Sequence, residues 1–192
     1  QVIEAALEVG SDYLDMASNE MLEERDGTRV LVEQLEYAGR FEDRGLTAII
    51  LAGGDAGLVN VMAREAADEL DEVDSIRIRD YGVTECDEPV AGWSFPTYME
   101  DCAAEAVYWE DGEYKWVPPF SGEEDYHFPP PLDVTGTVFF HCHEEPVTIP
   151  AFLGKPVRYV DFKMGDPGSA MWRFLIEGLG LMDETPVGGE DC

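Results

Sequence analysis

The sequence predicts an α/β segment, the end of a doubly wound parallel sheet, followed by an α+β domain with a mostly antiparallel sheet. Three observations support this. Helical and strand patterns alternate over residues 2–52, which is typical of a doubly wound sheet. An apolar run at 47–52 is followed by a glycine-rich turn and an amphipathic segment. From residue 73 onward, polar and apolar residues alternate in strand-like runs around an Asp111-Gly112 hairpin signal.

The first 52 residues predict the order helix, strand, helix, strand. Residues 2–9 are mainly apolar and precede Gly10, which is typical of a helix that ends at a glycine cap. Residues 12–15 form a short strand pattern, and a polar loop leads to a helical pattern at 30–41. The apolar run 47–51 is short and contains two adjacent isoleucines, which predicts a strand buried on both faces.

The turn after this strand contains Gly53, Gly54 and Gly57, and a helical pattern follows at about 57–70. Ligands of open α/β sheets bind at the carboxyl ends of strands, and a helix N-terminus there offers free N–H groups to an anion. The turn is not G-x-G-x-x-G, so it is not the primary pyrophosphate site. Two interpretations stay open: a ligand contact, or a packing turn in which Asp55 caps the helix.

The sequence of the second part of the chain predicts strands and helices that do not alternate regularly. They are a strand with one solvent-exposed face at 73–83, a short helix at 97–104, a hairpin at 106–117, strands at 134–143 and 156–163, and a helix that starts at Asp166.

The charge balance is strongly acidic, with 12 basic against 42 acidic residues and a net charge of −30. Nucleic acids and anionic membranes need a basic surface, so both are excluded as partners. The acidic residues are spread along the chain rather than gathered in a tail, which favours a surface adapted to high salt, as in halophilic archaea.

The cysteines Cys86, Cys102, Cys142 and Cys192 form no C-x-x-C pair, so we expect reduced thiols in a cytoplasmic protein. No apolar run approaches the length of a membrane-spanning helix. The chain begins at Gln1 inside a helical pattern, and we interpret it as a fragment of a longer protein.

The segment His141-Cys142-His143-Glu144-Glu145 ends the strand predicted at 134–143. Alternation would place both histidines on one face, where a further cysteine could complete a zinc site. No second ligand pair has metal spacing, which disfavours zinc. The alternatives are a strand end with groups that titrate near neutrality, or a histidine that binds a substrate carboxylate or exchanges a proton.

Several segments, in this order, resemble the saccharopine dehydrogenase family, near its saccharopine reductase and carboxynorspermidine dehydrogenase members. The resemblance covers residues 1 to about 187, and its segments are 5–15, 52–60, 92–94, 109–112, 117–123 and 143–150.

This resemblance implies a bilobal, homodimeric oxidoreductase that binds NAD(P) in a Rossmann lobe and a small-molecule substrate in a second lobe. Residues 1–55 would be the end of the cofactor lobe, and 56–192 the α+β substrate-binding and dimerisation domain. The family reaction transfers a hydride between NAD(P) and a secondary amine derived from an amino acid. The first Rossmann strands and their glycine motif are missing here, so we expect the fragment alone to be inactive. The alternative is a non-catalytic module that dimerises or binds small molecules.

The site residues follow from the resemblance and from the turn. The family turn Gly-x-Asp-Pro-Gly matches at three positions and has Ala56 in place of Pro, and a His-x-Glu-x-x-Thr segment matches at 143–148. We expect no metal. The expected residues are His143 and Glu145 for catalysis, Asp15, Gly53, Asp55 and Gly57 for the cofactor, and Asn60, Trp93 and Thr148 for the substrate.

Overall fold

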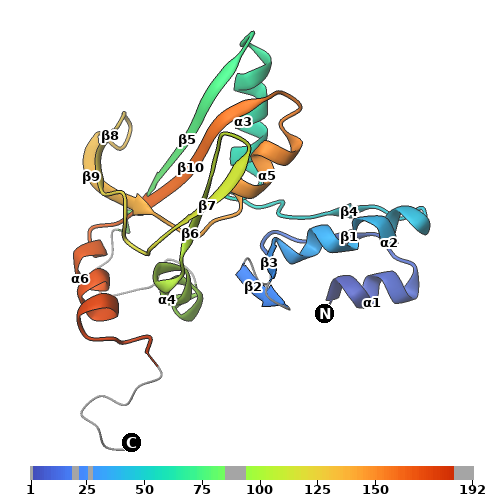
Figure 1. Ribbon diagram of the computed structural model, residues 1–192, viewed down its shortest axis with the longest axis horizontal. Coiled ribbons are helices and arrows are strands. Elements are labelled where there is room, and N and C mark those ends of the chain that lie inside the picture. The colour runs from blue at the N-terminus through green and yellow to red at the C-terminus, as the bar shows by residue number, and fades with distance from the viewer. Residues whose placement is uncertain (1, 19–21, 26–27, 85–93, 184–192) are drawn as a thin grey trace, which may run out of the picture. The chain divides into compact units, whose positions relative to one another are not determined.

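The computed structural model describes residues 2–18, 22–25, 28–84 and 94–183 (Figure 1). Trp93, Cys86, Cys192 and the tail at 185–192 lie outside the described residues. The chain forms two compact units. The first comprises residues 1–76, 109–114 and 143–160, and the second comprises 77–108, 115–142 and 161–192. The boundary between residues 55 and 56 falls inside the first unit and stays a prediction.

The parallel strand pair predicted for the first part is present. Strand β1 (Tyr13–Leu14) pairs in parallel with β4 (Ala48–Ile49), with Tyr13 opposite Ala48. Two backbone bonds flank the pair: Tyr13 N–H donates to Thr47 O at 3.0 Å and Asp15 N–H to Ile49 O at 3.1 Å. This arrangement confirms the α/β character of the first part.

Helix α1 (Val2–Val9) ends at Gly10, whose φ of 73° closes it as predicted. Its buried residues Ile3 and Leu7 pack with Phe41 of helix α2 (Ala38–Asp43). Together these helices cover the strand pair, because Tyr13 and Ala48 pack against the same cluster.

The segment between β1 and β4 differs from the prediction. A hairpin of β2 (Leu22–Arg25) and β3 (Thr28–Leu31) replaces the polar loop, and the helix predicted at 30–41 is a 3-10 helix, η1 (Glu33–Tyr37), followed by α2. The prediction was wrong at its start because the backbone of residues 30 and 31 pairs with β2.

Helices α3 (Leu58–Asp68) and α5 (Glu145–Phe152) contact each other in the first unit. Arg64 Nη1 donates to Leu153 O at 2.9 Å. Lys155 Nζ donates to Ala67 O at 2.6 Å and Leu70 O at 2.8 Å, carbonyls at the end of α3. These cations donate to carbonyls at the ends of both helices, and so fasten α5 to α3.

A six-stranded sheet has the order β7-β6-β10-β9-β8, with β5 also paired to β10 (Figure 1). The β10/β6, β10/β9 and β8/β9 pairs are antiparallel, which confirms the predicted sheet type. The strands are β5 (Val73–Tyr81), β6 (Ala106–Glu110), β7 (Glu113–Val117), β8 (Glu124–Phe128), β9 (Val134–Phe140) and β10 (Val157–Gly165).

The hairpin between β6 and β7 turns at Asp111 and Gly112, whose φ values of 53° and 90° fit a type I′ turn. Strand β8 was not predicted. Its sequence, EDYHF, carries few of the apolar residues that mark a strand.

The core of the second unit joins helix α4 (Phe95–Ala103) to the helical segment formed by α6 (Ser169–Arg173) and the π-helical turn η2 (Phe174–Gly178). Helix α6 begins at Ser169, later than predicted, and Asp166 Oδ1 accepts the backbone N–H of Gly168 at 2.5 Å, as a residue that precedes a helix commonly does. The buried cluster with its half-buried neighbours is Met99, Cys102, Phe120, Phe139, Ile176, Tyr98, Ala103 and Trp172.

Strand β5 follows the predicted pattern only in part, because Arg77 is exposed and Arg79 is not. The Arg79 side chain is 4% exposed and its guanidinium pairs with Asp161 Oδ1 of β10 at 2.8 Å. It also contacts Glu124 Oε2 at 2.9 Å, and Lys163 Nζ lies 2.8 Å from the same oxygen. Arg79 is therefore part of a buried ion network, because the partner strand supplies its counter-charge.

Among the described helices, none combines the length and apolar character that crossing a bilayer requires. Cys102 and Cys142 are buried thiols, and burial raises the pKa of Cys102 to about 12.

Candidate functional site

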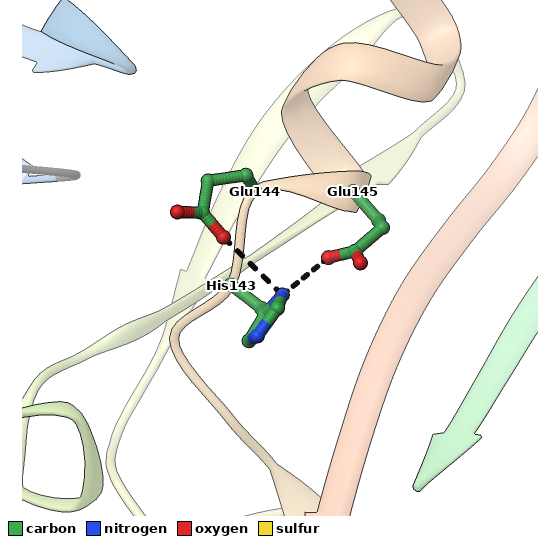
Figure 2. Close-up of side chains that lie close together, drawn as sticks. All are labelled: His143, Glu144 and Glu145. Carbon is green, nitrogen blue, oxygen red and sulfur yellow. Dashed lines mark hydrogen bonds and ion pairs between the residues drawn. The ribbon is translucent and has the colours of Figure 1, made fainter. Parts of the chain in front are cut away.

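The start of helix α5 gathers His143, Glu144 and Glu145, here called the His143 cluster (Figure 2). Figure 2 shows both carboxylates directed at the imidazole. His143 Nδ1 bonds Glu145 Oε2 and lies 3.3 Å from Glu144 Oε2. The Glu145 side chain is fully buried, and its Oε1 has no hydrogen-bond partner among the described residues.

Burial alone would lower the pKa of His143, because it disfavours the charged ring. The hydrogen bond to Glu145 and the charges of Glu145, Glu144 and Asp55 outweigh burial and raise the pKa to about 9. The imidazole is therefore charged at neutral pH. This places Asp55, from the glycine turn, in the electrostatic environment of the cluster.

The predicted strand 134–143 ends at Phe140, so the alternation that would align His141 and His143 does not apply. His141 is buried in the second unit, with its ring 6.4 Å from that of Phe162. Among the described residues, the one group that could hold a metal ion comprises His143, Glu144 and Glu145. Neither His141 nor Cys142 belongs to this group, so the described residues give no support to the zinc alternative built on His141, Cys142 and His143.

Several N–H groups at the glycine turn and the start of α3 donate to acceptors within the same segment. Leu58 and Val59 donate to Gly53 O and Gly54 O at 2.9 and 3.0 Å, and Gly57 N–H donates to Asn60 Oδ1 at 3.1 Å. The N–H groups of Gly57, Leu58 and Val59 are therefore engaged within the protein, while an anion contact at this turn stays a prediction. Glycine is required at Gly57, whose φ is 134° and where a Cβ would lie 2.4 Å from Gly53 O.

Asp15 joins the two parallel strands. Its Oδ1 accepts the N–H of Leu51 at 2.6 Å and its Oδ2 accepts from Gln34 Nε2 at 3.3 Å. Burial and the hydrogen bond to Asp15 raise the pKa of Tyr13 to about 12. Both carboxylate oxygens of Asp15 thus have protein partners, while its role toward a cofactor stays a prediction.

Asn60 and Thr148 meet between α3 and α5. Asn60 Nδ2 donates to Thr148 Oγ1 at 2.8 Å, and Thr148 Oγ1 donates to Glu144 O at 3.0 Å. Ser18 was missed by the sequence analysis, and its Oγ donates to Glu144 Oε1 at 2.5 Å. The two partners are 126 positions apart, so no local pattern could have indicated the contact.

A pocket of about 700 Å³ in the first unit brings together four of the predicted residues: Gly53, Gly57, Asn60 and Thr148. Thr148 connects the pocket to the His143 cluster through its bond to Glu144 O. The remaining lining is mainly apolar and comprises Gln34, Leu35, Tyr37, Ala38, Ala48, Ile49, Ile50, Leu51, Ala52, Leu58, Val61 and Phe152.

No protein-family model matches the chain. It is 29% identical to carboxynorspermidine synthase of Vibrio alginolyticus, over 97% of this chain and 45% of that protein. The enzyme of the same name from Vibrio cholerae is 29% identical over 82% of this chain and 38% of its own length. Carboxyaminopropylagmatine dehydrogenase of Synechocystis is 27% identical over 73% and 35%. The chain thus spans less than half the length of these relatives.

Among solved structures, saccharopine dehydrogenase (L-Glu forming) from Saccharomyces cerevisiae superposes with a TM-score of 0.65 over 96% of this chain and 42% of that chain. At 15% identity, this similarity shows a shared fold. The chain is therefore a relative of the carboxynorspermidine synthases and has the fold of saccharopine dehydrogenase, as the resemblance in its motifs implies.

Proposed function

We propose that this chain is part of an NAD(P)-dependent oxidoreductase that joins an amine to a carbonyl compound and reduces the resulting imine to a secondary amine. The names of the relatives, two synthases and a dehydrogenase, support this reaction class. The observation in the structure that carries it is the charged, buried His143 cluster, linked through Thr148 to a pocket at the glycine turn.

The residues of the cluster suit an amine substrate. Glu144, Glu145 and Asp55 set three carboxyl groups around one imidazole, so the local field favours a cation. At neutral pH, the Nδ1 proton of His143 lies in the hydrogen bond to Glu145. When a basic nitrogen of the substrate takes the place of Glu145, His143 can transfer a proton to that nitrogen. A bound nicotinamide supplies the hydride, and the protein contributes orientation and electrostatics.

The pocket fits the uncharged nicotinamide end of the cofactor, because Ile50, Leu51 and Gly53 offer apolar surface and backbone. The start of α3 suits the pyrophosphate less well, since the N–H groups of Gly57, Leu58 and Val59 already have protein acceptors. The pyrophosphate would need another segment. That requirement agrees with the absence of G-x-G-x-x-G from these 192 residues.

The test uses the protein encoded by the complete gene, assayed in high salt. We expect NADH or NADPH oxidation that depends on both an amine and a carbonyl compound. Glu145→Gln should lower kcat/KM by about 100-fold or more, because it removes the negative charge that stabilises the proton on His143. Thr137→Val serves as the control, since Thr137 bonds Asp125 in the second unit. Binding of NAD(P)H without oxidation would favour the non-catalytic alternative, and a failure to bind it would contradict the proposal.

A further inference from the structure

Three hydrogen bonds in series connect the glycine turn to the His143 cluster. The N–H of Gly57 donates to Asn60 Oδ1 at 3.1 Å, and Asn60 Nδ2 donates to Thr148 Oγ1 at 2.8 Å. Thr148 Oγ1 donates to Glu144 O at 3.0 Å. Below, this series is called the Asn60–Thr148 relay, and it runs from the start of α3 to the start of α5.

The direction of each bond is set by the donors and acceptors available. The Asn60 carbonyl can only accept and its NH₂ can only donate, so the amide has one orientation that serves both neighbours. The Thr148 hydroxyl donates to a carbonyl one helical turn earlier, a common arrangement that orients the oxygen. Its oxygen then accepts from Asn60. Both polar atoms of Asn60 and the hydroxyl proton of Thr148 are thus engaged within the protein.

Glu144 is held from two directions. Its carbonyl accepts from Thr148, and its carboxylate accepts from Ser18 Oγ at 2.5 Å. Glu144 precedes Glu145, the first residue of α5, and both face His143. A shift at the start of this helix would therefore change the distances between the imidazole and both carboxylates.

The relay also fixes the third acidic group. Asp55 lies on the turn, between Gly53 and Gly57, and its charge acts on His143. Because Gly57 is bonded to Asn60 and Asn60 to Thr148, the relay holds the turn relative to α5. The titratable groups that act on His143 are thus Glu144 and Glu145 at α5 and Asp55 on the turn.

We infer that Asn60 and Thr148 are positioning residues, which hold the glycine turn and the start of α5 so that His143, Glu145 and Asp55 keep their arrangement. This role replaces the substrate contacts that the sequence predicts for the two residues. Its meaning for catalysis rests on the proposed function, whereas the arrangement itself can be tested without substrate or cofactor.

The experiment follows the imidazole of His143 by NMR in the full 192-residue chain. The chain has three histidines, so His143→Gln assigns the signal. Thr148→Val removes the hydroxyl and keeps the side-chain shape, and Asn60→Ala removes the amide. Each should lower the His143 titration midpoint by about one unit, because the charged ring loses part of its contact with the carboxylates.

Two comparisons separate positioning from a general loss of structure. Thr148→Ser retains the hydroxyl and should keep the midpoint of the wild type. Thr137→Val, which removes a hydroxyl bonded to Asp125, should also leave it unchanged. The double variant should shift the midpoint no further than either single variant, because the bonds act in series.

Unchanged midpoints in folded Thr148→Val and Asn60→Ala, or shifts that add in the double variant, would overturn the inference. In the complete protein, a raised KM for the amine with an unchanged His143 midpoint would make Thr148 a substrate contact instead. If Thr148→Val does not fold, Asn60→Ala and Thr148→Ser still decide the question. None of these readouts depends on whether the protein oxidises NAD(P)H, so failure of the proposed function would be seen separately.

Discussion

At the scale of single residues, His143 combines burial with a raised affinity for its proton. Its pKa is about 9 in the folded protein, against 6.5 for an ordinary histidine. The folded state therefore binds the proton more tightly than the unfolded chain. This contribution to stability is complete below pH 6.5 and is lost as the pH rises through about 9.

We predict that Glu145→Gln lowers the free energy of unfolding more at pH 6 than at pH 10. The neutral amide cannot stabilise the imidazolium, and that stabilisation matters only while the ring is charged. Urea unfolding at a series of pH values measures the difference. His143→Gln, which has no imidazole, should likewise lack the pH dependence of the free energy of unfolding that the charged ring causes. Equal destabilisation by Glu145→Gln at both ends of the range would show that the carboxylate does not interact with a charged ring.

Residue by residue, the sequence identified part of the site. His143 and Glu145 were expected from the resemblance of their segment to a known family, and Gly57 from a glycine turn that follows an apolar strand. Ser18 and the Asp15 bond to Leu51 depend on how distant segments pack, and no local pattern reports that. For a related reason, spacing did not show that carbonyls of the turn accept the N–H groups of Leu58 and Val59 at the start of α3.

At the scale of elements, strands β5 and β10 carry two ion pairs of contrasting burial. Arg79 and Asp161 have side chains 4% and 2% exposed, whereas Arg158 and Asp74 are 49% and 72% exposed. A buried charge that loses its partner is costly, while an exposed pair is screened by solvent. The same two strands thus provide both a sensitive site and its matched control.

We predict that Asp161→Asn destabilises the protein by about 3–5 kcal/mol, because it removes one of the two carboxylates, those of Asp161 and Glu124, that neutralise the buried Arg79 guanidinium. Asp74→Asn should cost at most about 1 kcal/mol. Denaturant unfolding of both variants measures the two values. Similar losses in the two variants would mean that burial does not set the strength of the Arg79 pair.

We further predict that Lys155→Met loosens α5 from α3, because it removes the donor to the carbonyls of Ala67 and Leu70. Methionine keeps most of the aliphatic stem, so the loss isolates the ammonium group. Amide hydrogen exchange at the end of α3 should become faster. Arg173→Met, which removes an exposed pair with Glu177 in the second unit, is the control. Unchanged exchange would show that the ammonium does not hold the helix end.

Helices and strands were predictable where the spacing of apolar residues and the turn residues within the element itself determine its type. Helix α1, the β1/β4 pair and the β6–β7 hairpin follow from spacing and turn residues. Strand β5 was predicted, but the burial of Arg79 was not, because its counter-charge, Asp161, lies 82 positions away in the sequence. Hairpin β2–β3 and strand β8 are polar, and tertiary pairing rather than propensity makes them strands.

At the scale of the whole molecule, the net charge of −30 over 192 residues dominates. The acidic residues are spread along the chain, so folding brings like charges closer together than they are in the unfolded state. At an ionic strength of 0.1 M the Debye length is about 10 Å, so neighbouring surface carboxylates repel one another. At 1 M it is about 3 Å, and this repulsion is screened. We therefore expect the folded state to be more stable in concentrated salt than in dilute buffer.

We predict that the free energy of unfolding rises steadily between about 0.1 M and 1 M KCl, the range over which the Debye length falls from about 10 Å to about 3 Å. Thermal unfolding at fixed pH measures the rise. Screening depends on ionic strength, whereas the exclusion of sulfate from protein surfaces stabilises proteins of any charge. KCl and K₂SO₄ compared at equal ionic strength therefore distinguish the two causes. Stabilisation by both salts would support screening of the acidic surface, and stabilisation by sulfate alone would remove the reason to connect the charge with a saline habitat.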